Sequence, residues 1–357
     1  MTGRGIDQIL PHPSDPQLFE SYVTSALVYV ELAEKVSGPV KRPVPFDYIW
    51  GDALRHLRER KPDARIVNLE TAVTTQDDPW PYKGIHYRMH PANVPCLTAA
   101  AIDCCVLANN HVLDWGREGL VETLETLGSV GIRTAGAGRN AEQAFTPAIL
   151  PTSAGGRVAV HAFALVSSGV PPEWRAAVDR PGINVLRDLS GHSLDVVKRQ
   201  VEKHRRAGDI VIVSLHWGPN WGFDVDPAEQ EFARGLVAEA GADIVHGHSS
   251  HHVKGIEVYR ERLILYGCGD LLNDYEGIGG HATYRGDLAL LYFPTLEASS
   301  GRLLELSMVP TRTRKMRIND ASAEEAQWLE ATLSRTGANL GTSADRAPDG
   351  TLRLRWQ

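Results

Sequence analysis

The sequence predicts a layered α/β fold. Short apolar runs alternate along the chain with amphipathic stretches of helical period, and several of these runs are apolar throughout rather than at every second residue. Strands of that kind are typical of a sheet that is covered on both faces. We therefore expect one main domain whose ligand-binding residues lie on loops at the carboxyl ends of its strands.

The predicted elements follow in chain order. Strands are expected over 65–69, 102–108, 158–165, 210–215, 243–246, 263–266 and 288–293, with a final half-exposed strand over 303–308. Helices are expected over 16–36, 51–60, 116–130, 194–206, 227–240 and 321–334. In the third helix, Leu120, Leu124 and Leu127 fall on one face. The predicted domain covers 1–314, and 315–357 is predicted as a peripheral helix with a polar tail.

The composition excludes several classes of protein. Of the 357 residues 43% are hydrophobic and 23% are charged, which is ordinary globular usage. The net charge is 37 − 44 = −7, so no nucleic-acid partner is expected. No stretch approaches the ~18 apolar residues of a membrane-spanning helix. Four cysteines, of which Cys104 and Cys105 are adjacent, make no disulfide framework, so the expected location is a reducing cytosol.

Polar residues follow four of the predicted strands. In an open α/β sheet the strand ends lie side by side, so residues that are distant in sequence can share one crevice. Four of the 14 histidines lie within the seven residues 246–252. Neutral imidazole with carboxylate and amide oxygens suits a divalent metal ion. The residues at the strand ends are Glu70, then Asn110, His111 and Asp114, then His216 and Trp217, then His248, His251 and His252.

Each of these residues also has a purely structural interpretation. Glu70 and Asp114 are suitable helix N-caps, and Asp114 stands just before the predicted helix 116–130. Trp217 either packs in the core or forms part of a substrate platform. Lys83 and Arg88 either meet an anionic substrate or belong to an ordinary surface loop.

The ordered motifs resemble the CapA family, the poly-γ-glutamate capsule biosynthesis proteins, whose fold is similar to that of calcineurin-like metallophosphoesterases. The resemblance runs from Met1 to about Pro310 and implies a four-layer α/β/β/α sandwich with a dinuclear metal cleft. The motifs are Asn68-Leu69-Glu70, Asn109-Asn110-His111 with Asp114, His216-Trp217-Gly218, and Gly247-His248 with His251.

The resemblance also implies roles for individual residues. The ions would be Mn, Fe or Zn. His111 would be the general acid, Asp114 would orient it, and Arg4 would hold a phosphate or carboxylate. His251 and His252 compete for one role, because Gly-His-Ser-Ser-His-His is looser than the Gly-His-x-His of the related phosphoesterases. The implied metal ligands are Glu70, Asn110, His216, His248 and His251.

The beginning of the chain departs from the family pattern. The family usually opens with a strand, then Gly-Asp and a small apolar stretch ending in Arg, whereas this chain begins Met1-Thr2-Gly3-Arg4-Gly5. Two explanations stay open. Either the true start lies upstream of Met1 and restores the aspartate ligand, which we favour, or one ligand and one strand are absent.

Three functions are compatible with these residues. The first is a metal-dependent hydrolase of phosphoester or amide bonds, acting on a phosphorylated, peptide or anionic polymer substrate in cell-envelope metabolism. The second is a metal-independent peptide epimerase that uses His and acid pairs. The third is a non-catalytic accessory protein of a capsule synthase, envelope-associated if an upstream anchor exists.

Overall fold

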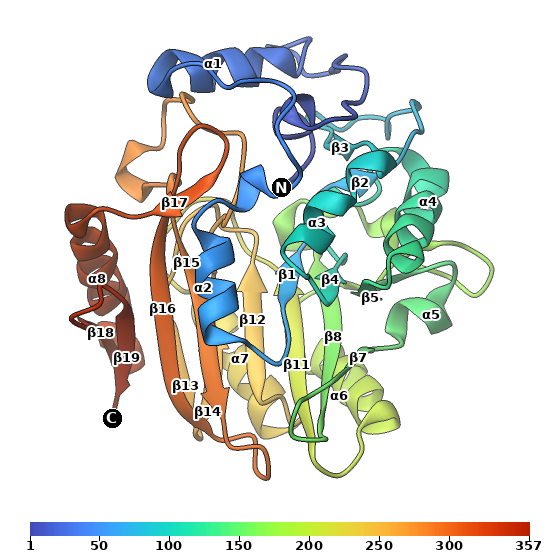
Figure 1. The fold of residues 1–357 in the computed structure, drawn as a ribbon. Coiled ribbons are helices and arrows are strands. Elements are labelled where there is room, and N and C mark those ends of the chain that lie inside the picture. The colour runs from blue at the N-terminus through green and yellow to red at the C-terminus, as the bar shows by residue number, and fades with distance from the viewer.

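The computed structural model describes residues 1–357 and confirms a mixed α/β architecture. Its largest sheet has seven strands in the order β10-β8-β11-β12-β14-β13, with β7 beside β8. The five strands from β10 to β14 in this order are parallel to their neighbours, and β7 and β13 are antiparallel (Figure 1). Their bounds are β7 Ala148–Pro151, β8 Arg157–Leu165, β10 Val185–Leu186, β11 Asp209–His216, β12 Ile244–His248, β13 Ile256–Tyr259 and β14 Arg262–Leu265.

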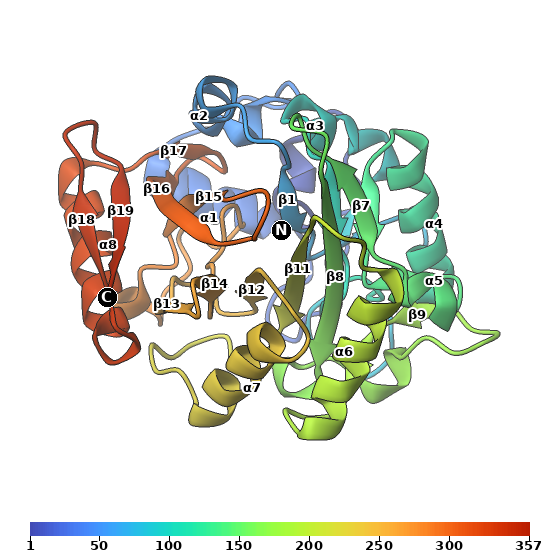
Figure 2. The same cartoon turned by 90° about the horizontal axis from the view of Figure 1, so that it is seen from below.

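Both faces of this sheet are buried, as the continuous apolar strands predict. Along β8, Val160 and Ala162 belong to a core of 65 buried residues, whereas Phe163 and Leu165 belong to a second core of 18. The smaller core lies beneath α6 (Gly191–His204) and α7 (Pro227–Ala238), which cover one face together (Figure 2). The other face meets a second layer of strands.

The second layer combines a parallel and an antiparallel sheet. The parallel sheet has the order β1-β4-β5, and the antiparallel one β15-β16-β19-β18 with β17 beside β16. Helices α2 to α5 and two short strand pairs, β2–β3 and β6–β9, complete this side. The bounds are β1 Ile66–Asn68, β2 Ala72–Val73, β3 Arg88–Met89, β4 Cys104–Val106, β5 Arg133–Ala135, β6 Ala137–Gly138, β9 Gly182–Ile183, β15 Leu288–Leu296, β16 Leu303–Thr313, β17 Ile318–Asp320, α2 Ala53–Arg60, α3 Pro95–Ala99, α4 Gly116–Ser129 and α5 Ala141–Phe145.

Strand β1 is less buried than its apolar sequence predicts. Ile66, Val67 and Asn68 are half-buried, whereas the three residues of β4 are fully buried. The reason is that β1 pairs only with β4 and therefore forms one edge of its sheet. Strand β15 is likewise paired on one side only, with β16.

The first predicted helix is only half formed. Helix α1 covers Leu27–Ser37, while most of 16–26 is irregular, with a bridge between Gln17 and Ser25. In this stretch Glu20 is drawn inward, where its carboxylate accepts a hydrogen bond from Arg4 at 2.8 Å. The backbone of 16–26 thus follows the burial of the Arg4–Glu20 ion pair and not the helical period of the sequence.

The C-terminal region is more ordered than a polar tail. Helix α8 (Ala323–Gly337) begins at a capping box formed by Ser322 and Glu325. It is followed by strands β18 (Thr342–Arg346) and β19 (Leu352–Trp356), and β19 pairs with β16. The prediction of a polar tail is wrong here, because Ala344, Leu352 and Leu354 alternate with charged residues and are buried. Figure 1 shows this unit on the outer side of β16.

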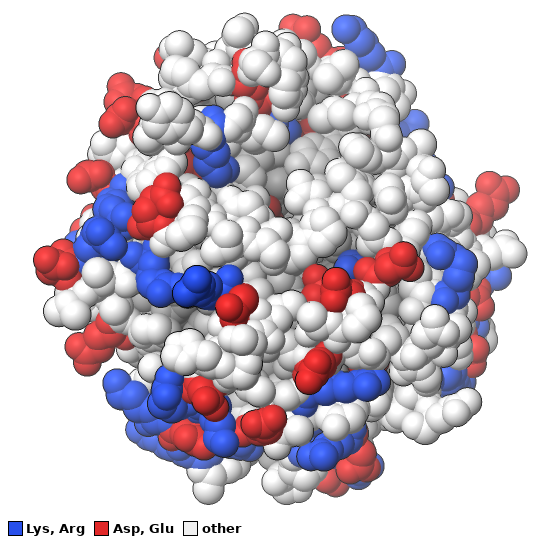
Figure 3. All heavy atoms as spheres, turned by 180° about the vertical axis from the view of Figure 1, so that it is seen from behind, with Lys and Arg blue, Asp and Glu red and all other residues white.

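Two properties of the surface and the helices bear on partners. Acidic and basic side chains are interspersed over the face in Figure 3 rather than gathered by sign. None of the helices combines the length and the apolar character needed to cross a bilayer.

Candidate active site

Strands β11 and β12 carry polar side chains at alternate positions on one face. Ser214 and His216 on β11 stand in register with His246 and His248 on β12. Their apolar neighbours Val213, Leu215 and Val245 belong to the smaller core beneath α6 and α7. Since successive side chains of a strand point to opposite faces, the four polar residues point towards the second layer of strands.

These four side chains form a continuous hydrogen-bonded chain. Ser214 Oγ lies 3.0 Å from His246 Nδ1 and 2.9 Å from His248 Nε2. His248 Nδ1 lies 2.8 Å from His216 Nδ1. Burial lowers the pKa of both His216 and His248 well below the usual value, and neighbouring histidines add to the shift. Both rings are therefore neutral at neutral pH, as metal ligands or proton acceptors must be.

Glu70 approaches the end of this chain from the second layer. Its Oε1 atom lies 3.9 Å from His216 Nε2, and that nitrogen is buried without a hydrogen-bond partner. Asn68 donates to the other carboxylate oxygen at 2.8 Å. Burial raises the pKa of Glu70 to about 7, against the opposing effect of His251. This carboxyl group therefore titrates near neutral pH.

The turn after β4 joins the ends of β1 and β4. Asn109 Nδ2 donates to the Leu69 carbonyl at 2.9 Å and to Asn68 Oδ1 at 3.0 Å, and Asn109 Oδ1 accepts from the His111 backbone at 3.0 Å. The next residue, Asn110, has its Oδ1 atom buried with no partner. The turn is therefore fixed, and one amide oxygen is left available for a ligand.

His111 belongs to a buried charged group with Asp114 and Lys83. His111 Nδ1 lies 2.7 Å from Asp114 Oδ2, and Lys83 Nζ lies 2.8 Å from Asp114 Oδ1. Burial would raise the pKa of Asp114, but Lys83 and His111 outweigh it and keep the carboxylate ionised. Burial, followed by Lys83, lowers the pKa of His111 to about 4. The neutral ring thus donates from Nδ1 to Asp114 and keeps a lone pair on Nε2.

The structure distinguishes between the two adjacent histidines. His251 Nδ1 lies 2.9 Å from Asp270 Oδ2, and the carboxylates of Asp270 and Glu70 overcome burial to raise the pKa of His251. His252 has both ring nitrogens occupied by backbone, Nδ1 by the Val253 carbonyl and Nε2 by the Gly222 N–H. His251 is therefore held by Asp270, and His252 has no nitrogen free for catalysis.

Arg4, predicted to bind an anionic ligand, is fully engaged within the protein. Its guanidinium forms two hydrogen bonds to Asp274, at 2.8 and 2.6 Å, and one to Glu20. It also lies over the rings of Tyr29 and Tyr87. The structure therefore differs from the prediction that Arg4 binds an anionic ligand, because the buried carboxylates of Asp274 and Glu20 already neutralise its guanidinium.

Arg88 and Trp217, predicted to bind substrate, are held by structural contacts. Arg88 is buried, donates to the Gln76 and Asp15 carbonyls, and covers Trp115. The indole of Trp217 is 3% exposed and donates to the Tyr266 carbonyl. Both side chains are thus occupied by structural contacts, although Arg88 Nε is buried without a hydrogen-bond partner.

The geometry fits the predicted metal ligands only in part. Glu70, His216 and Asn110 offer the carboxylate, imidazole and amide donors that suit a divalent ion, and two of their atoms are buried without partners. However, no three His, Cys, Asp or Glu side chains converge as a metal cluster, and His216 and His248 bond each other instead. The donor chemistry of these residues suits a divalent ion, and binding of one ion or of two stays a prediction.

Several residues of the cluster went unassigned at the level of sequence. Ser214 and His246 extend the histidine chain, and Asp270 holds His251. The sequence does mark Ser214 and His246: each is a polar residue inside an apolar strand, two positions before His216 or His248. Asp270 follows β14, as the other site residues follow their strands, but a Gly-rich turn separates it from the strand end.

Comparison with known proteins gives a consistent result. Residues 1–275 match the family described as bacterial capsule synthesis protein PGA_cap. A probable polyglutamine synthesis accessory protein of Mycobacterium tuberculosis H37Rv is 45% identical over 355 residues, covering 99% of this chain and 93% of the relative. Capsule biosynthesis protein CapA of Bacillus anthracis is 29% identical over 198 residues, covering 54% of this chain and 45% of that protein. PGA biosynthesis protein CapA of Bacillus subtilis is 27% identical over 216 residues, covering 60% and 54%. The chain therefore belongs to the CapA family of bacterial capsule synthesis proteins.

Proposed function

We propose that this chain is a metal-dependent hydrolase that acts on an amide or phosphoester bond during the synthesis of a glutamate polymer. The observation that carries the proposal is the 3.9 Å approach of Glu70 Oε1 to the unpartnered Nε2 of His216. The names of the relatives, a polyglutamine synthesis accessory protein and two CapA proteins, support the polymer and a synthase partner.

The proposal includes a fold of the metallophosphoesterase type, a four-layer α/β/β/α sandwich. Its support is the seven-stranded sheet with α6 and α7 on one face and strand-built layers on the other. In such a sandwich the active site lies at strand ends, where Glu70, His111, His216 and His248 are placed.

The chain's own residues have separable roles. Glu70, His216 and Asn110 would hold Mn, Fe or Zn, and the ion when bound stabilises negative charge and activates water. His248 and Ser214 orient the ring of His216. His111 uses its free Nε2 to take up or deliver a proton, and Asp114 fixes its tautomer. His251, with Asp270, places a positive charge close to Glu70.

Metal binding and turnover test the proposal together. The full chain is loaded with Mn²⁺, Zn²⁺ or Fe²⁺, desalted and measured for metal content, then assayed on poly-γ-glutamate and on a phosphodiester. We expect His216→Ala to lose metal and turnover together. His161→Ala is the matched control, since His161 is a buried histidine of the adjacent strand β8 that lies beside His204 of α6. A wild-type chain that retains none of the three metals contradicts the proposal.

A metal-independent epimerase is the second candidate. The observation that favours it is the pair of groups poised for proton transfer, Glu70 with a pKa of about 7 and His111 with a free Nε2. It predicts activity that survives EDTA and deuterium incorporation at Cα in heavy water. Loss of all activity in EDTA rules it out.

A non-catalytic accessory role is the third candidate, favoured by the printed name of the mycobacterial relative. It predicts that the chain co-purifies with a polymer synthase and shows no turnover with any of the three metals. Fractionation of the producing cells would then test whether the chain is cytoplasmic or travels with the synthase at the envelope.

A further inference from the structure

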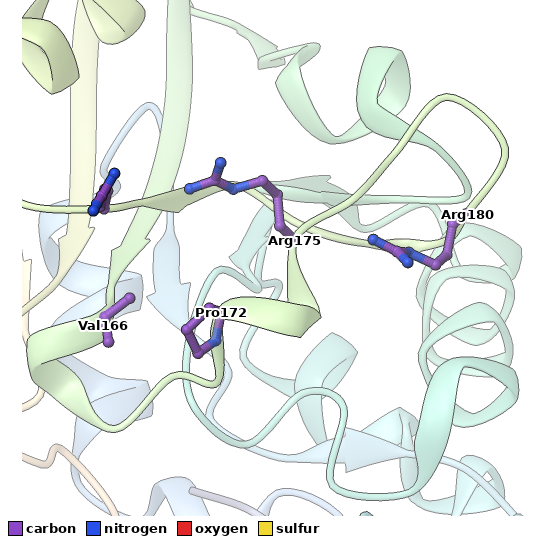
Figure 4. Close-up of a pocket in the computed structure, with 5 residues that line it drawn as sticks. Val166, Pro172, Arg175 and Arg180 are labelled. Atoms are coloured by element: carbon purple, nitrogen blue, oxygen red, sulfur yellow. The ribbon is translucent and has the colours of Figure 1, made fainter.

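A hollow of about 510 Å³ lies on the segment that follows β8. It is lined by Val166, Pro172, Arg175, Arg180 and Arg187. Figure 4 shows the side chains of Arg175 and Arg180 extending over the hollow, with Val166 and Pro172 below them. Three of the five lining residues are therefore cationic, in a chain whose net charge is −7.

None of these three arginines forms a salt bridge, although Arg187 contributes to a lowered pKa of the adjacent Asp188. The salt bridges of the structure occupy many of its other arginines, but none includes Arg175, Arg180 or Arg187, and none of their guanidinium groups donates a hydrogen bond within the protein. All three side chains are exposed. Each guanidinium thus keeps its planar set of donors available for a carboxylate or phosphate.

The backbone beneath the arginines is well fixed. Trp174, which directly precedes Arg175, is completely buried beside Trp80 and anchors this part of the chain. Ala176 N–H donates to the Ile183 carbonyl at 3.0 Å, and Ala177 N–H donates to the Arg180 carbonyl at 3.0 Å. A short hairpin therefore holds Arg175 and Arg180 near each other, while their side chains stay free.

The hollow lies at the carboxyl ends of the strands of the large sheet, as does the candidate active site. Arg187 directly follows β10 and Val166 directly follows β8, and β8 is the neighbour of β11, which ends at His216. At a strand spacing of about 4.8 Å, the ends of β10 and β11 lie about 10 Å apart. The connecting segment also contacts the site, because Ser168 Oγ donates to the His216 carbonyl at 3.0 Å.

We propose that Arg175, Arg180 and Arg187 bind the carboxylates of an acidic polypeptide and hold it so that it enters the site at His216. An extended chain advances about 3.3–3.6 Å per residue, so roughly three residues span the separation. The inference rests on the proposed function in one respect, that the His216 site acts on a chain of this kind.

The lining favours carboxylates over nucleic acid. All three cations are arginines, whose fork matches a carboxylate or a phosphate equally well, so the choice depends on the rest of the lining. The lining contains no aromatic side chain on which a base could stack, a feature that single-stranded nucleic-acid sites commonly use.

Fluorescence anisotropy with a labelled oligo-γ-glutamate tests the inference on the full chain. We expect the triple variant Arg175→Gln, Arg180→Gln, Arg187→Gln to bind the probe roughly tenfold more weakly or worse. The matched control is Arg58→Gln, Arg133→Gln, Arg260→Gln, which removes the same charge from exposed arginines without salt bridges elsewhere and should bind like the wild type.

The outcomes separate this inference from the proposed function. Equal binding by the triple variant and the wild type overturns the inference, and so does equally tight competition by a single-stranded DNA of the same charge. Binding that depends on the three arginines and persists in His216→Ala supports the inference even where no turnover is found. Turnover that depends on His216 but not on the three arginines supports the proposed function and overturns the inference.

Discussion

The imidazole of His111 donates from Nδ1 to Asp114, whose Oδ2 atom lies 2.7 Å away, while Lys83 Nζ forms an ion pair with the other carboxylate oxygen at 2.8 Å. Asp114 is completely buried and also accepts from the Tyr87 backbone N–H at 2.7 Å. A single carboxylate thus fixes a histidine tautomer, neutralises a lysine and positions a loop. It stabilises the fold and prepares the site at the same time.

Replacing Asp114→Asn should therefore destabilise the protein. The variant leaves Lys83 with no carboxylate in a largely buried position, which should lower the free energy of unfolding by about 3 kcal/mol. Urea denaturation measures it. Adding Lys83→Met to the Asp114→Asn variant should partly restore stability, so the two changes together should cost less than their sum. Strict additivity would show that the pair does not interact.

Glu70 should make the stability depend on pH. Its pKa in the folded protein, about 7, lies above the usual 4.5, so between these values the folded state holds a proton that the unfolded state has released. Stability should therefore fall as the pH rises through this window, by about 3 kcal/mol. In EDTA, Glu70→Gln should lose this part of the pH dependence. An unchanged dependence of the unfolding free energy on pH would contradict the assignment.

The buried ion group around Arg4 provides a third prediction. Arg4→Met leaves Asp274 and Glu20 buried without their cation, so the free energy of unfolding should fall by about 3–5 kcal/mol. Arg42→Met is the control, because Arg42 is 38% exposed and lies 3.5 Å from Glu34, and its loss should cost less than about 1 kcal/mol. Similar losses in both variants would refute a structural role for Arg4.

The sequence predicts the parts of the fold that depend on local pattern. The strands β8, β11, β12 and β14 are predicted to within about two residues, because each is a mainly apolar run between turns. Strands β18 and β19 could not be foreseen in this way. Their sequences are half polar, and they are strands because β16 offers an edge on which β19 pairs.

The same distinction applies to the site. Position at a strand end pointed to the approach of His216 to His248, because parallel strands of one sheet bring their carboxyl ends to one edge. Glu70 follows β1 of the other sheet, so its approach to His216 depends on how the two sheets pack. Position could not predict the partners. Arg4 is a candidate ligand residue by sequence, yet Asp274, 270 positions later, occupies its guanidinium. Tertiary contacts of that range leave no mark on local sequence.

Ser214 provides the last prediction, since its hydroxyl joins two imidazoles. Ser214→Ala leaves His246 Nδ1 and His248 Nε2 without this partner, which should lower the free energy of unfolding by about 1–2 kcal/mol. If His216 binds a cation, loss of the support behind His248 should also weaken metal affinity by roughly 10–100-fold. Ser193→Ala is the matched control, because this buried hydroxyl bonds only Asp188, away from the histidines. Zn²⁺ titration by calorimetry separates an effect on metal affinity from an effect on stability alone. Equal Zn²⁺ affinity in both variants would limit Ser214 to a structural role. A loss of affinity confined to Ser214→Ala would show that its hydroxyl supports the histidine that binds the metal.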